Sequence, residues 1–266
     1  MNRIVVEPEE IHNGRVELSD NRADHIRNVL GATVGQALKV GVADGKLGLG
    51  EVVRCDASGV ELALTLEGEG PEPWCDLILA MPRPRVLKRL WAQVAALGVG
   101  RLFLIHAARV EACYFGSHWL RPAAYRPLLI EGLMQAGTTR VPHVFIEPKL
   151  KRFADLRLPA IAAGAVCFIA HPDAAPTDET GWPMVAEGRR PVIAVGPEGG
   201  WMDDEVALFE SHGFRRLSLG RRILRTDTAC VALLATLGRL FDGQTAKGCV
   251  TPMSPTAPLL RKPAGV

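Results

Sequence analysis

Apolar residues in the C-terminal part of the chain switch between short unbroken runs and helical spacing. Residues 192–195 read Val-Ile-Ala-Val, a run that is typical of a buried parallel strand. Three acids at 203–205 suit the first turn of a helix, and Gly213 is its natural end. A second strand is expected at 215–219. After it, apolar residues recur at the spacing of another helix: Val231, Leu233, Leu234, Leu237, Leu240 and Phe241.

The first 70 residues have a different pattern, with short runs that suit strands rather than long helices. Asp44-Gly45 is a strong hairpin signal between two of these runs. One helix is expected after Ser19 or Asp20, with an apolar face made of Ala23, Ile26, Val29 and Leu30. The expected strands are Val5-Val6, 15–18, 37–43, 47–54 and 60–66. Several short strands around one helix predict a small β-barrel over residues 1–70.

A charged segment with glycine and proline, residues 67–73, separates this first domain from the rest of the chain. Beyond it, strands alternate with helices. The expected strands are 77–81, 101–105, 144–146 and 165–170, and the expected helices run from Pro84 to Gly98 and near 127–135. This alternation predicts an α/β domain with a largely parallel sheet over residues 74–244. Residues 245–266 contain four prolines without any periodic pattern, and we expect a flexible tail there.

Composition and charge exclude several classes of protein. The apolar fraction of 48% is sufficient for a sizeable core, and the net charge of only +2 means that any basic surface must be local. Six scattered cysteines without a Cys-x-x-Cys pair predict no metal site and no disulfide framework, and they suit a reducing cytosol. No signal peptide is apparent, and no run reaches the roughly 18 apolar residues of a membrane helix. We expect a cytoplasmic protein without a membrane-bound segment.

Three turns follow directly after predicted strands, at residues 171–172, 196–200 and 220–226. Sheets of this type bind ligands outside the carboxyl ends of their strands, so the three turns are expected to meet at one pocket. Residues 196–200 read Gly-Pro-Glu-Gly-Gly, and glycines allow a backbone to approach a ligand closely. Thr226 or Asp227 is the predicted N-cap of the helix that follows the third turn.

The Gly-Pro-Glu-Gly-Gly turn is followed, one helix and one strand later, by Leu-Gly-Arg-Arg-Ile-Leu-Arg-Thr-Asp-Thr-Ala at 219–229. This pairing resembles the trefoil-knotted SPOUT RNA methyltransferases and, within them, the RsmE family. The resemblance covers most of the chain and implies a knotted α/β domain preceded by a PUA-like RNA-binding β-barrel. It also implies an S-adenosyl-L-methionine-dependent enzyme that methylates N3 of a uridine in 16S ribosomal RNA of the 30S subunit.

The resemblance assigns the loops after three strands to the cofactor S-adenosyl-L-methionine. The residues that it implies are Ala170, His171, Gly196, Pro197, Glu198, Gly199, Gly200, Leu219, Gly220, Ile223, Leu224, Thr226, Thr228 and Ala229. Leu219, Ile223 and Leu224 suit apolar walls, although Leu219 and Ile223 could instead belong to the core. His171 is also a candidate base by residue type, against the alternative of a loop histidine hydrogen-bonded to backbone.

Arginines beside the third turn suggest chemistry on the RNA side of the pocket. Arg225 is the predicted catalytic residue, because a fixed cation would lower the cost of the negative charge that uridine N3 must carry during attack. Arg221 is more simply a solvated charge. The residues expected to bind RNA are Arg3, Arg22, His25, Arg27 and Arg222.

The chain departs from the family pattern mainly on the RNA side. Many members have a basic residue where this chain has Gln93, an acid at Ala96, and arginine at Thr138 and Gly31. These differences leave open a SPOUT methyltransferase that acts on another RNA site, or a non-catalytic RNA-binding protein in ribosome assembly. An NTPase or a dehydrogenase is not favoured, because neither glycine-rich phosphate motif occurs at a strand-to-helix turn.

The family also implies an unusual topology and a homodimer. Connections in α/β domains are almost never knotted, yet here residues 219–241 are expected to thread past the 196–200 loop. The last helix carries more apolar surface than one contact with its own sheet needs, at Val231, Leu234, Leu237 and Phe241. This surplus predicts a two-fold interface between subunits, against the alternative that these residues only cover the sheet.

Overall fold

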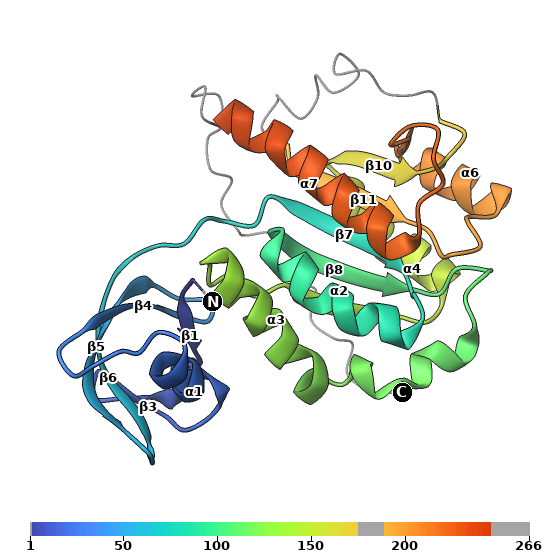
Figure 1. The fold of residues 1–266 in the computed structure, drawn as a ribbon. Helices are drawn as coiled ribbons and strands as arrows, with labels where there is room; N and C mark the ends of the chain where they lie inside the picture. The colour runs from blue at the N-terminus through green and yellow to red at the C-terminus, as the bar shows by residue number, and fades with distance from the viewer. Residues whose placement is uncertain (1, 175–188, 246–266) are drawn as a thin grey trace.

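Two β-sheets of six strands each organise the chain in the computed structural model, one sheet in each domain (Figure 1). The structure describes residues 2–174 and 189–245, so the tail predicted after residue 245 lies outside the described residues. A segment around residues 69–74 connects the two sheets. Within the described ranges, no helix combines the length and the apolar character that crossing a membrane requires.

The N-terminal sheet curls around helix α1 (Asn21–Asn28) and forms a half-barrel (Figure 1). Its strands are β1 (Ile4–Val6), β2 (Ile11–His12), β3 (Arg15–Leu18), β4 (Ala37–Val42), β5 (Leu47–Asp56) and β6 (Gly59–Gly68), with a short 3-10 helix η1 (Pro8–Glu10) before β2. The order is β1-β4-β5-β6-β3-β2, with β1 parallel to β4 and the other pairs antiparallel. Among the described residues, β1 and β2 do not pair with each other and remain the two edges of the sheet. The strands of the predicted barrel are therefore present, but the barrel is not closed.

Two local predictions for this domain are confirmed. Asp20 is the N-cap of α1, where its side chain accepts a hydrogen bond from the backbone N–H of Arg22. The loop that contains Asp44 and Gly45 connects β4 to β5 as an antiparallel hairpin. Asp44 has a φ of 55°, a left-handed conformation that aspartate tolerates better than most residues.

The C-terminal sheet is parallel throughout, as predicted, and has the order β12-β10-β11-β7-β8-β9. Its strands are β7 (Cys75–Ala80), β8 (Val99–Ile105), β9 (His143–Glu147), β10 (Val166–Ala170), β11 (Pro191–Val195) and β12 (Arg215–Leu217). The connections contain α2 (Pro84–Ala96), η2 (Ala112–Gly116), η3 (His118–Leu120), α3 (Pro122–Ala136), α4 (Leu150–Leu156), α5 (Leu158–Ala162) and α6 (Asp203–Ser211), and α7 (Thr226–Thr245) follows β12.

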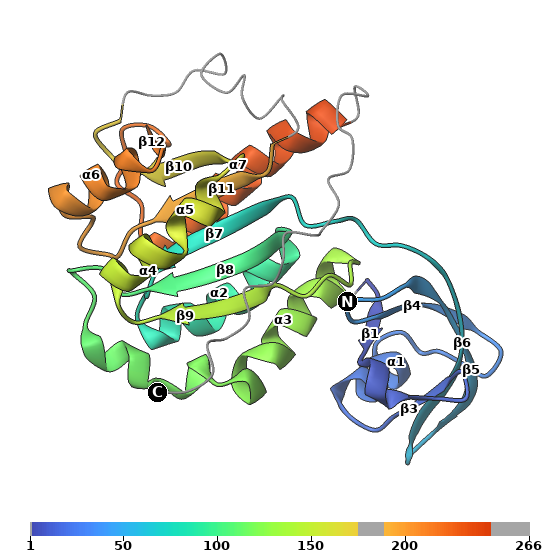
Figure 2. The same ribbon diagram turned by 180° about the vertical axis from the view of Figure 1, so that it is seen from behind.

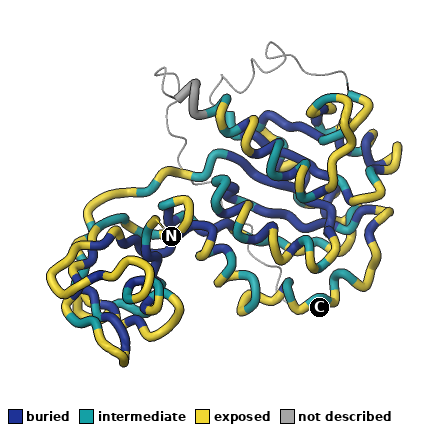
Figure 3. Tube along the Cα trace, in the orientation of Figure 1, coloured by how far each residue is buried: buried dark blue, intermediate teal, exposed yellow. Residues whose placement is uncertain are grey.

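Helices cover both faces of this sheet. Helices α2, α3 and α7 lie on the face seen in Figure 1, and α4 and α5 lie on the opposite face, seen in Figure 2. Every residue of β7 and of β11 is therefore buried, which explains why these strands are unbroken apolar runs apart from Asp76 (Figure 3). Asp76 is fully buried, and its carboxylate accepts hydrogen bonds from Arg101 and Arg190.

Two boundaries near the third turn differ from the prediction. The strand expected at 215–219 ends at Leu217, because Ser218 turns the chain: its Oγ accepts a hydrogen bond from Gly220 N at 3.2 Å. Thr226 is the first residue of α7 and not its N-cap. Its hydroxyl donates instead to the carbonyl of Gly196, 3.2 Å away on the neighbouring turn.

The apolar surface of α7 is used mostly within the subunit. Leu234 and Leu237 are 1% and 0% exposed, so they cover their own sheet and cannot form a surface for a second copy. Phe241 contacts Trp74, with the ring centroids 5.9 Å apart. The prediction that Leu234 and Leu237 form a subunit interface is therefore wrong. The threading of 219–241 past the 196–200 loop remains a prediction.

The two domains are joined by hydrogen bonds of main-chain groups and of the Asp44 and Thr139 side chains. The backbone N–H of Arg3 donates to the carbonyl of Met134, near the end of α3. At the tip of the β4–β5 hairpin, Asp44 N donates to Thr139 O at 2.8 Å, and the Asp44 carboxylate accepts from Val141 N at 2.8 Å. The hydroxyl of Thr139, a fully buried residue, donates to Gly45 O. These contacts fix the hairpin against the segment after α3.

Candidate functional site

Three neighbouring strands end at one edge of the C-terminal sheet. The ladder pairs Ile169 of β10 with Ala194 of β11, and Ala170 of β10 with Leu217 of β12. The turns that follow these strands therefore come together, as the sequence predicted. Between them lies a cavity of about 410 Å³, within the range of about 300–1,000 Å³ that is usual for small-molecule sites.

Most of the predicted cofactor residues line this cavity. They are Ala170, His171, Gly196, Pro197, Glu198, Gly199, Gly200, Leu219, Gly220, Ile223, Leu224, Thr226 and Ala229, together with Arg222, which was expected to bind RNA. Thr228 and Arg225 are exposed and are not among the lining residues. Thr228 points away because it lies within the first turn of α7, two residues beyond Thr226.

Several lining residues were not predicted. Asp173, Trp201, Asp203, Leu217 and Ser218 extend the predicted turns by a few positions, and Val195 and Leu233 lie under the turns. Pro172, in the turn predicted at 171–172, also lines the cavity. Arg109 is different, because it comes from the connection after β8, ninety residues before the glycine turn. Its position at the end of a parallel strand was the one signal in the sequence that could have suggested it.

Each glycine of the 196–200 turn has its own structural reason. A side chain on Gly196 would lie 2.9 Å from the indole nitrogen of Trp201, closer than packing allows. Gly200 has a φ of 76°, which side chains rarely adopt, and its N–H donates to Pro197 O at 2.9 Å. A side chain on Gly199 would meet the Arg109 side chain at 3.1 Å.

A buried carboxylate holds Arg109 at the cavity. Glu205 in α6 is 4% exposed, and its two oxygens accept from Ala108 N at 2.7 Å and from Met202 N at 2.9 Å. The first bond fixes the connection after β8, and the second fixes the start of α6. Arg109, next to Ala108, donates to the carbonyl of Gly199. Two segments far apart in the sequence are thereby brought together at the rim of the cavity.

The start of α7 is held on two sides. Thr226 is 5% exposed and bonds to Gly196, as described above. On the other side, the Asp227 carboxylate accepts from Arg89 of α2 at 2.7 Å, and this hydrogen bond holds the pKa of Asp227 below its usual value. The third turn is therefore anchored to both β11 and α2.

His171 has the environment of a loop histidine. Its backbone N–H donates to Leu217 O at 3.0 Å, which holds the turn against β12. The ring nitrogen Nδ1 accepts from the backbone N–H of Asp173 at 3.3 Å. These bonds favour a structural role over the role of a general base. His171 nevertheless lines the cavity, as predicted for a cofactor residue.

The apolar walls of the cavity are partly open to solvent. Leu219, Ile223 and Leu224 are 37%, 88% and 36% exposed, although all three line the cavity. The alternative that Leu219 and Ile223 belong to the core is therefore wrong. Exposed apolar side chains beside a cavity of this size suggest surfaces that a ligand or a partner covers.

Comparison with known proteins identifies the domain that contains this cavity. A sequence profile for the RNA methyltransferase domain matches residues 70–238, which include all three turns. The chain belongs to this family of RNA methyltransferases.

Similar proteins match nearly the whole chain. The ribosomal RNA small subunit methyltransferase E of Treponema pallidum is 29% identical over 241 residues, which are 89% of this chain and 90% of the relative. Two solved structures share the fold, each with a TM-score of 0.68 and 24% identity. One is a methyltransferase from Legionella pneumophila in complex with SAM, covering 90% of this chain and 97% of its own. The other is the small subunit methyltransferase E of Neisseria gonorrhoeae bound to S-adenosyl methionine, covering 91% and 98%.

The arginines expected to contact RNA in the N-terminal domain have partners inside the protein. The guanidinium of Arg3 donates to Val40 O and Gly137 O. Arg22 forms ion pairs with Glu10 and Asp20, and Arg27 pairs with Asp24 at 2.6 Å. His25 is half-buried, and its Nε2 has no hydrogen-bond partner among the described residues. An RNA-binding role for these residues remains a prediction.

The Gly196→Ala variant tests the geometry of the glycine turn in this methyltransferase domain. The added methyl group would force the Trp201 indole and the turn apart, so the affinity for S-adenosylmethionine should fall by at least about tenfold while the fold is retained. Gly116→Ala is the matched control: an added side chain at Gly116 would have no neighbour within 4 Å, its φ is not positive, and it lies outside the cavity. Calorimetric titration would measure both affinities. Equal affinities would contradict this role of Gly196.

Proposed function

We propose that the protein is an S-adenosylmethionine-dependent methyltransferase that modifies N3 of a uridine in 16S ribosomal RNA in the cytoplasm. The observation that carries this proposal is the cavity at the ends of β10, β11 and β12, inside the matched RNA methyltransferase domain. The names of the relatives support the small ribosomal subunit as the substrate. The uridine N3 specificity rests on the resemblance to the RsmE family.

The residues of the cavity suit this cofactor. Glycine backbone at 196–200 leaves room for a ligand to approach main-chain N–H and C=O groups, and Leu219 and Leu224 offer apolar contacts for an adenine ring. Carboxylates of Asp173 and Asp203 and the guanidinium of Arg109 provide charged groups for the two ends of an amino acid. When bound, S-adenosylmethionine supplies the electrophilic methyl group of the reaction.

Arg225 is the proposed catalytic residue on the uridine side. It is exposed directly before α7, between the cavity wall at Leu224 and the anchored Thr226. Since no ion pair to Arg225 is found in the described part of the chain, its guanidinium is available to the substrate. A positive charge there would favour the anionic form of the uracil ring, in which N3 is the better nucleophile.

The first alternative is a non-catalytic RNA-binding protein in ribosome assembly that retains the fold. A protein of that kind would not need a buried carboxylate and a buried threonine to hold three turns around a cavity, and this architecture favours the enzyme. The second alternative is a methyltransferase for another RNA site, and the residues at Gly31, Gln93, Ala96 and Thr138 are the places where the substrate preference could differ. We also propose a PUA-like role for the half-barrel domain, on the basis of the resemblance.

The Arg225→Ala variant tests the proposed chemistry. The wild type should transfer a methyl group from S-adenosylmethionine to 30S particles that lack the modification, with 3-methyluridine identified by mass spectrometry. The variant should lose on the order of 10²–10³ in kcat, as expected for one charge-stabilising contact, while its affinity for the cofactor changes little. Arg239→Ala, at an exposed arginine of α7 outside the cavity, is the control and should retain full activity. Wild-type protein that binds the cofactor without methylating any base would support the assembly-factor alternative.

We propose that the enzyme is a homodimer. Exposed apolar residues at the rim of the cavity support this proposal, whereas Leu234 and Leu237 of α7 are buried within the subunit. Met202, Leu219, Ile223 and Leu224 are exposed apolar residues in or beside the turns, and a second subunit would remove them from water. Sedimentation equilibrium at micromolar concentration should return about twice the chain mass of 28.7 kDa. Ile223→Lys should shift the protein toward the monomer, whereas a wild-type monomer would exclude the shared interface.

A further inference from the structure

Charge is divided unevenly between the two domains. Residues 1–70 contain seven Lys and Arg against twelve Asp and Glu, a net charge of −5. Because the whole chain carries +2, residues 71–266 carry +7. A domain that binds the phosphate backbone of RNA is expected to be locally basic, and the N-terminal domain is acidic.

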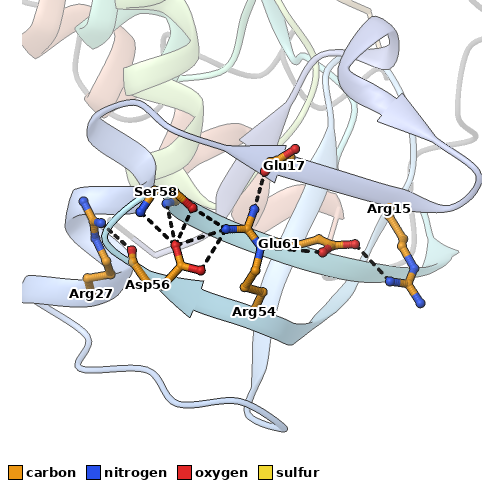
Figure 4. Close-up of polar contacts among 8 residues, drawn as sticks. Arg15, Glu17, Arg27, Arg54, Asp56, Ser58 and Glu61 are labelled. Atoms are coloured by element: carbon orange, nitrogen blue, oxygen red, sulfur yellow. Dashed lines mark hydrogen bonds and ion pairs between the residues drawn. The ribbon is translucent and has the colours of Figure 1, made fainter.

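The arginines of the N-terminal domain are also committed to partners inside the protein (Figure 4). On the outer face of the half-barrel, Arg15 pairs with Glu61 at 2.9 Å, and Arg54 pairs with Glu17 and Asp56. Hydrogen bonds from Ser58 and Arg54 hold the pKa of Asp56 well below its usual value, so this carboxylate stays charged beside Arg54.

The remaining arginines of this domain, Arg3, Arg22 and Arg27, are bonded to carbonyls or carboxylates, as described above. All five arginines of residues 1–70 are therefore paired. Releasing any of them toward a phosphate would leave a carboxylate or a carbonyl without its partner. Only Lys39 and Lys46 are exposed there without an ion pair among the described residues.

The methyltransferase domain, in contrast, has exposed arginines near the starts of α2 and α3 that have no carboxylate partner in the part of the chain described; the side chain of Arg83 does hydrogen-bond Tyr114. Arg83 and Arg85 follow the end of β7, and Arg121 precedes α3; all three are exposed, and none has a carboxylate partner within 4 Å in the described ranges. We call these three residues the strand-end arginines.

Arg83 lies close to the proposed cofactor turn, and the segment that contains Arg121 lies against α2. The backbone nitrogen of Arg83 lies 3.5 Å from the carboxylate of Glu198, a residue of the glycine turn. Lys88 of α2 places its ammonium group 4.8 Å from the ring centroid of Trp119, two residues before Arg121 in the chain. Helix α2 is therefore in contact with the segment before α3, and its start adjoins the rim of the cavity at Glu198.

We infer that the strand-end arginines bind the phosphate backbone of the RNA substrate, and that the N-terminal domain contributes few of the phosphate contacts. This inference rests on the proposed function, since it assumes an RNA substrate at the cavity. Guanidinium groups suit phosphate because they donate two parallel hydrogen bonds. Their place beside the cavity would hold the backbone next to the target base.

The salt dependence of RNA binding tests this inference. The probe is an unmodified in vitro transcript of 16S ribosomal RNA, titrated with the full chain at several KCl concentrations. Each lost phosphate contact lowers the slope of log Kd against log[KCl] by roughly 0.7–0.9. The Arg83→Ala/Arg85→Ala variant should therefore lower the slope by about 1.4–1.8 and weaken binding about tenfold at moderate salt.

Lys39→Ala/Lys46→Ala is the matched control, because it removes two exposed and unpaired cations from the N-terminal domain. It should leave the slope unchanged and the affinity within about twofold of the wild type. A larger loss in the lysine variant than in the arginine variant would overturn the inference and return the phosphate contacts to the N-terminal domain. An unchanged slope in the arginine variant would also overturn it.

Cofactor binding, measured on the same proteins, keeps the two proposals separate. Arg83 and Arg85 do not line the cavity, so both variants should bind S-adenosylmethionine as the wild type does. One outcome is a wild type that binds RNA through the strand-end arginines and yet has no affinity for S-adenosylmethionine. That result would support this inference and contradict the proposed enzyme. If the arginine variant binds the cofactor, methylates RNA and has the RNA affinity of the wild type, the proposed enzyme is supported and this inference is contradicted.

Discussion

The register of the parallel sheet is the constraint on which the site depends. Because β10, β11 and β12 are neighbours and end at the same level, three turns from distant parts of the sequence surround one cavity. Side chains then hold the turns at that edge: Thr226 joins the third turn to Gly196, and Glu205 joins the connection after β8 to α6. These bonds are buried, so breaking one would leave an unpaired polar group and would disturb every turn connected to it.

The same arrangement relates the cavity to the rest of the molecule. The strand-end arginines lack carboxylate partners among the described residues, whereas the arginines of the half-barrel are paired with carboxylates or carbonyls (Figure 4). Both domains expose charged side chains to solvent. The difference between their arginines therefore does not follow from the fold itself. Main-chain bonds at Asp44 and Thr139 fix the half-barrel beside α3. The domain can therefore act as a rigid neighbour of the substrate path without supplying its charge.

Sequence patterns predicted the parts that depend on local periodicity. The unbroken runs of β7 and β11, the glycine turn at 196–200 and the helical spacing in α7 all appear where expected. The errors concern contacts between distant residues. Leu237 looked available for a second subunit, because an apolar face does not say which neighbour covers it. Arg109 was missed as a cavity residue, because its position depends on the contact of the neighbouring Ala108 with Glu205. A closed barrel was wrongly expected, because the sequence does not show whether the two edge strands of a sheet pair with each other.

The central claim is that the turns after β10, β11 and β12 together form the cofactor site. Amide hydrogen exchange followed by mass spectrometry, with and without saturating S-adenosylmethionine, tests it most directly. The account predicts slower exchange in all three turns, around residues 170–173, 196–201 and 217–226, with little change in the half-barrel. Protection confined to one turn, or found mainly in the N-terminal domain, would contradict the account.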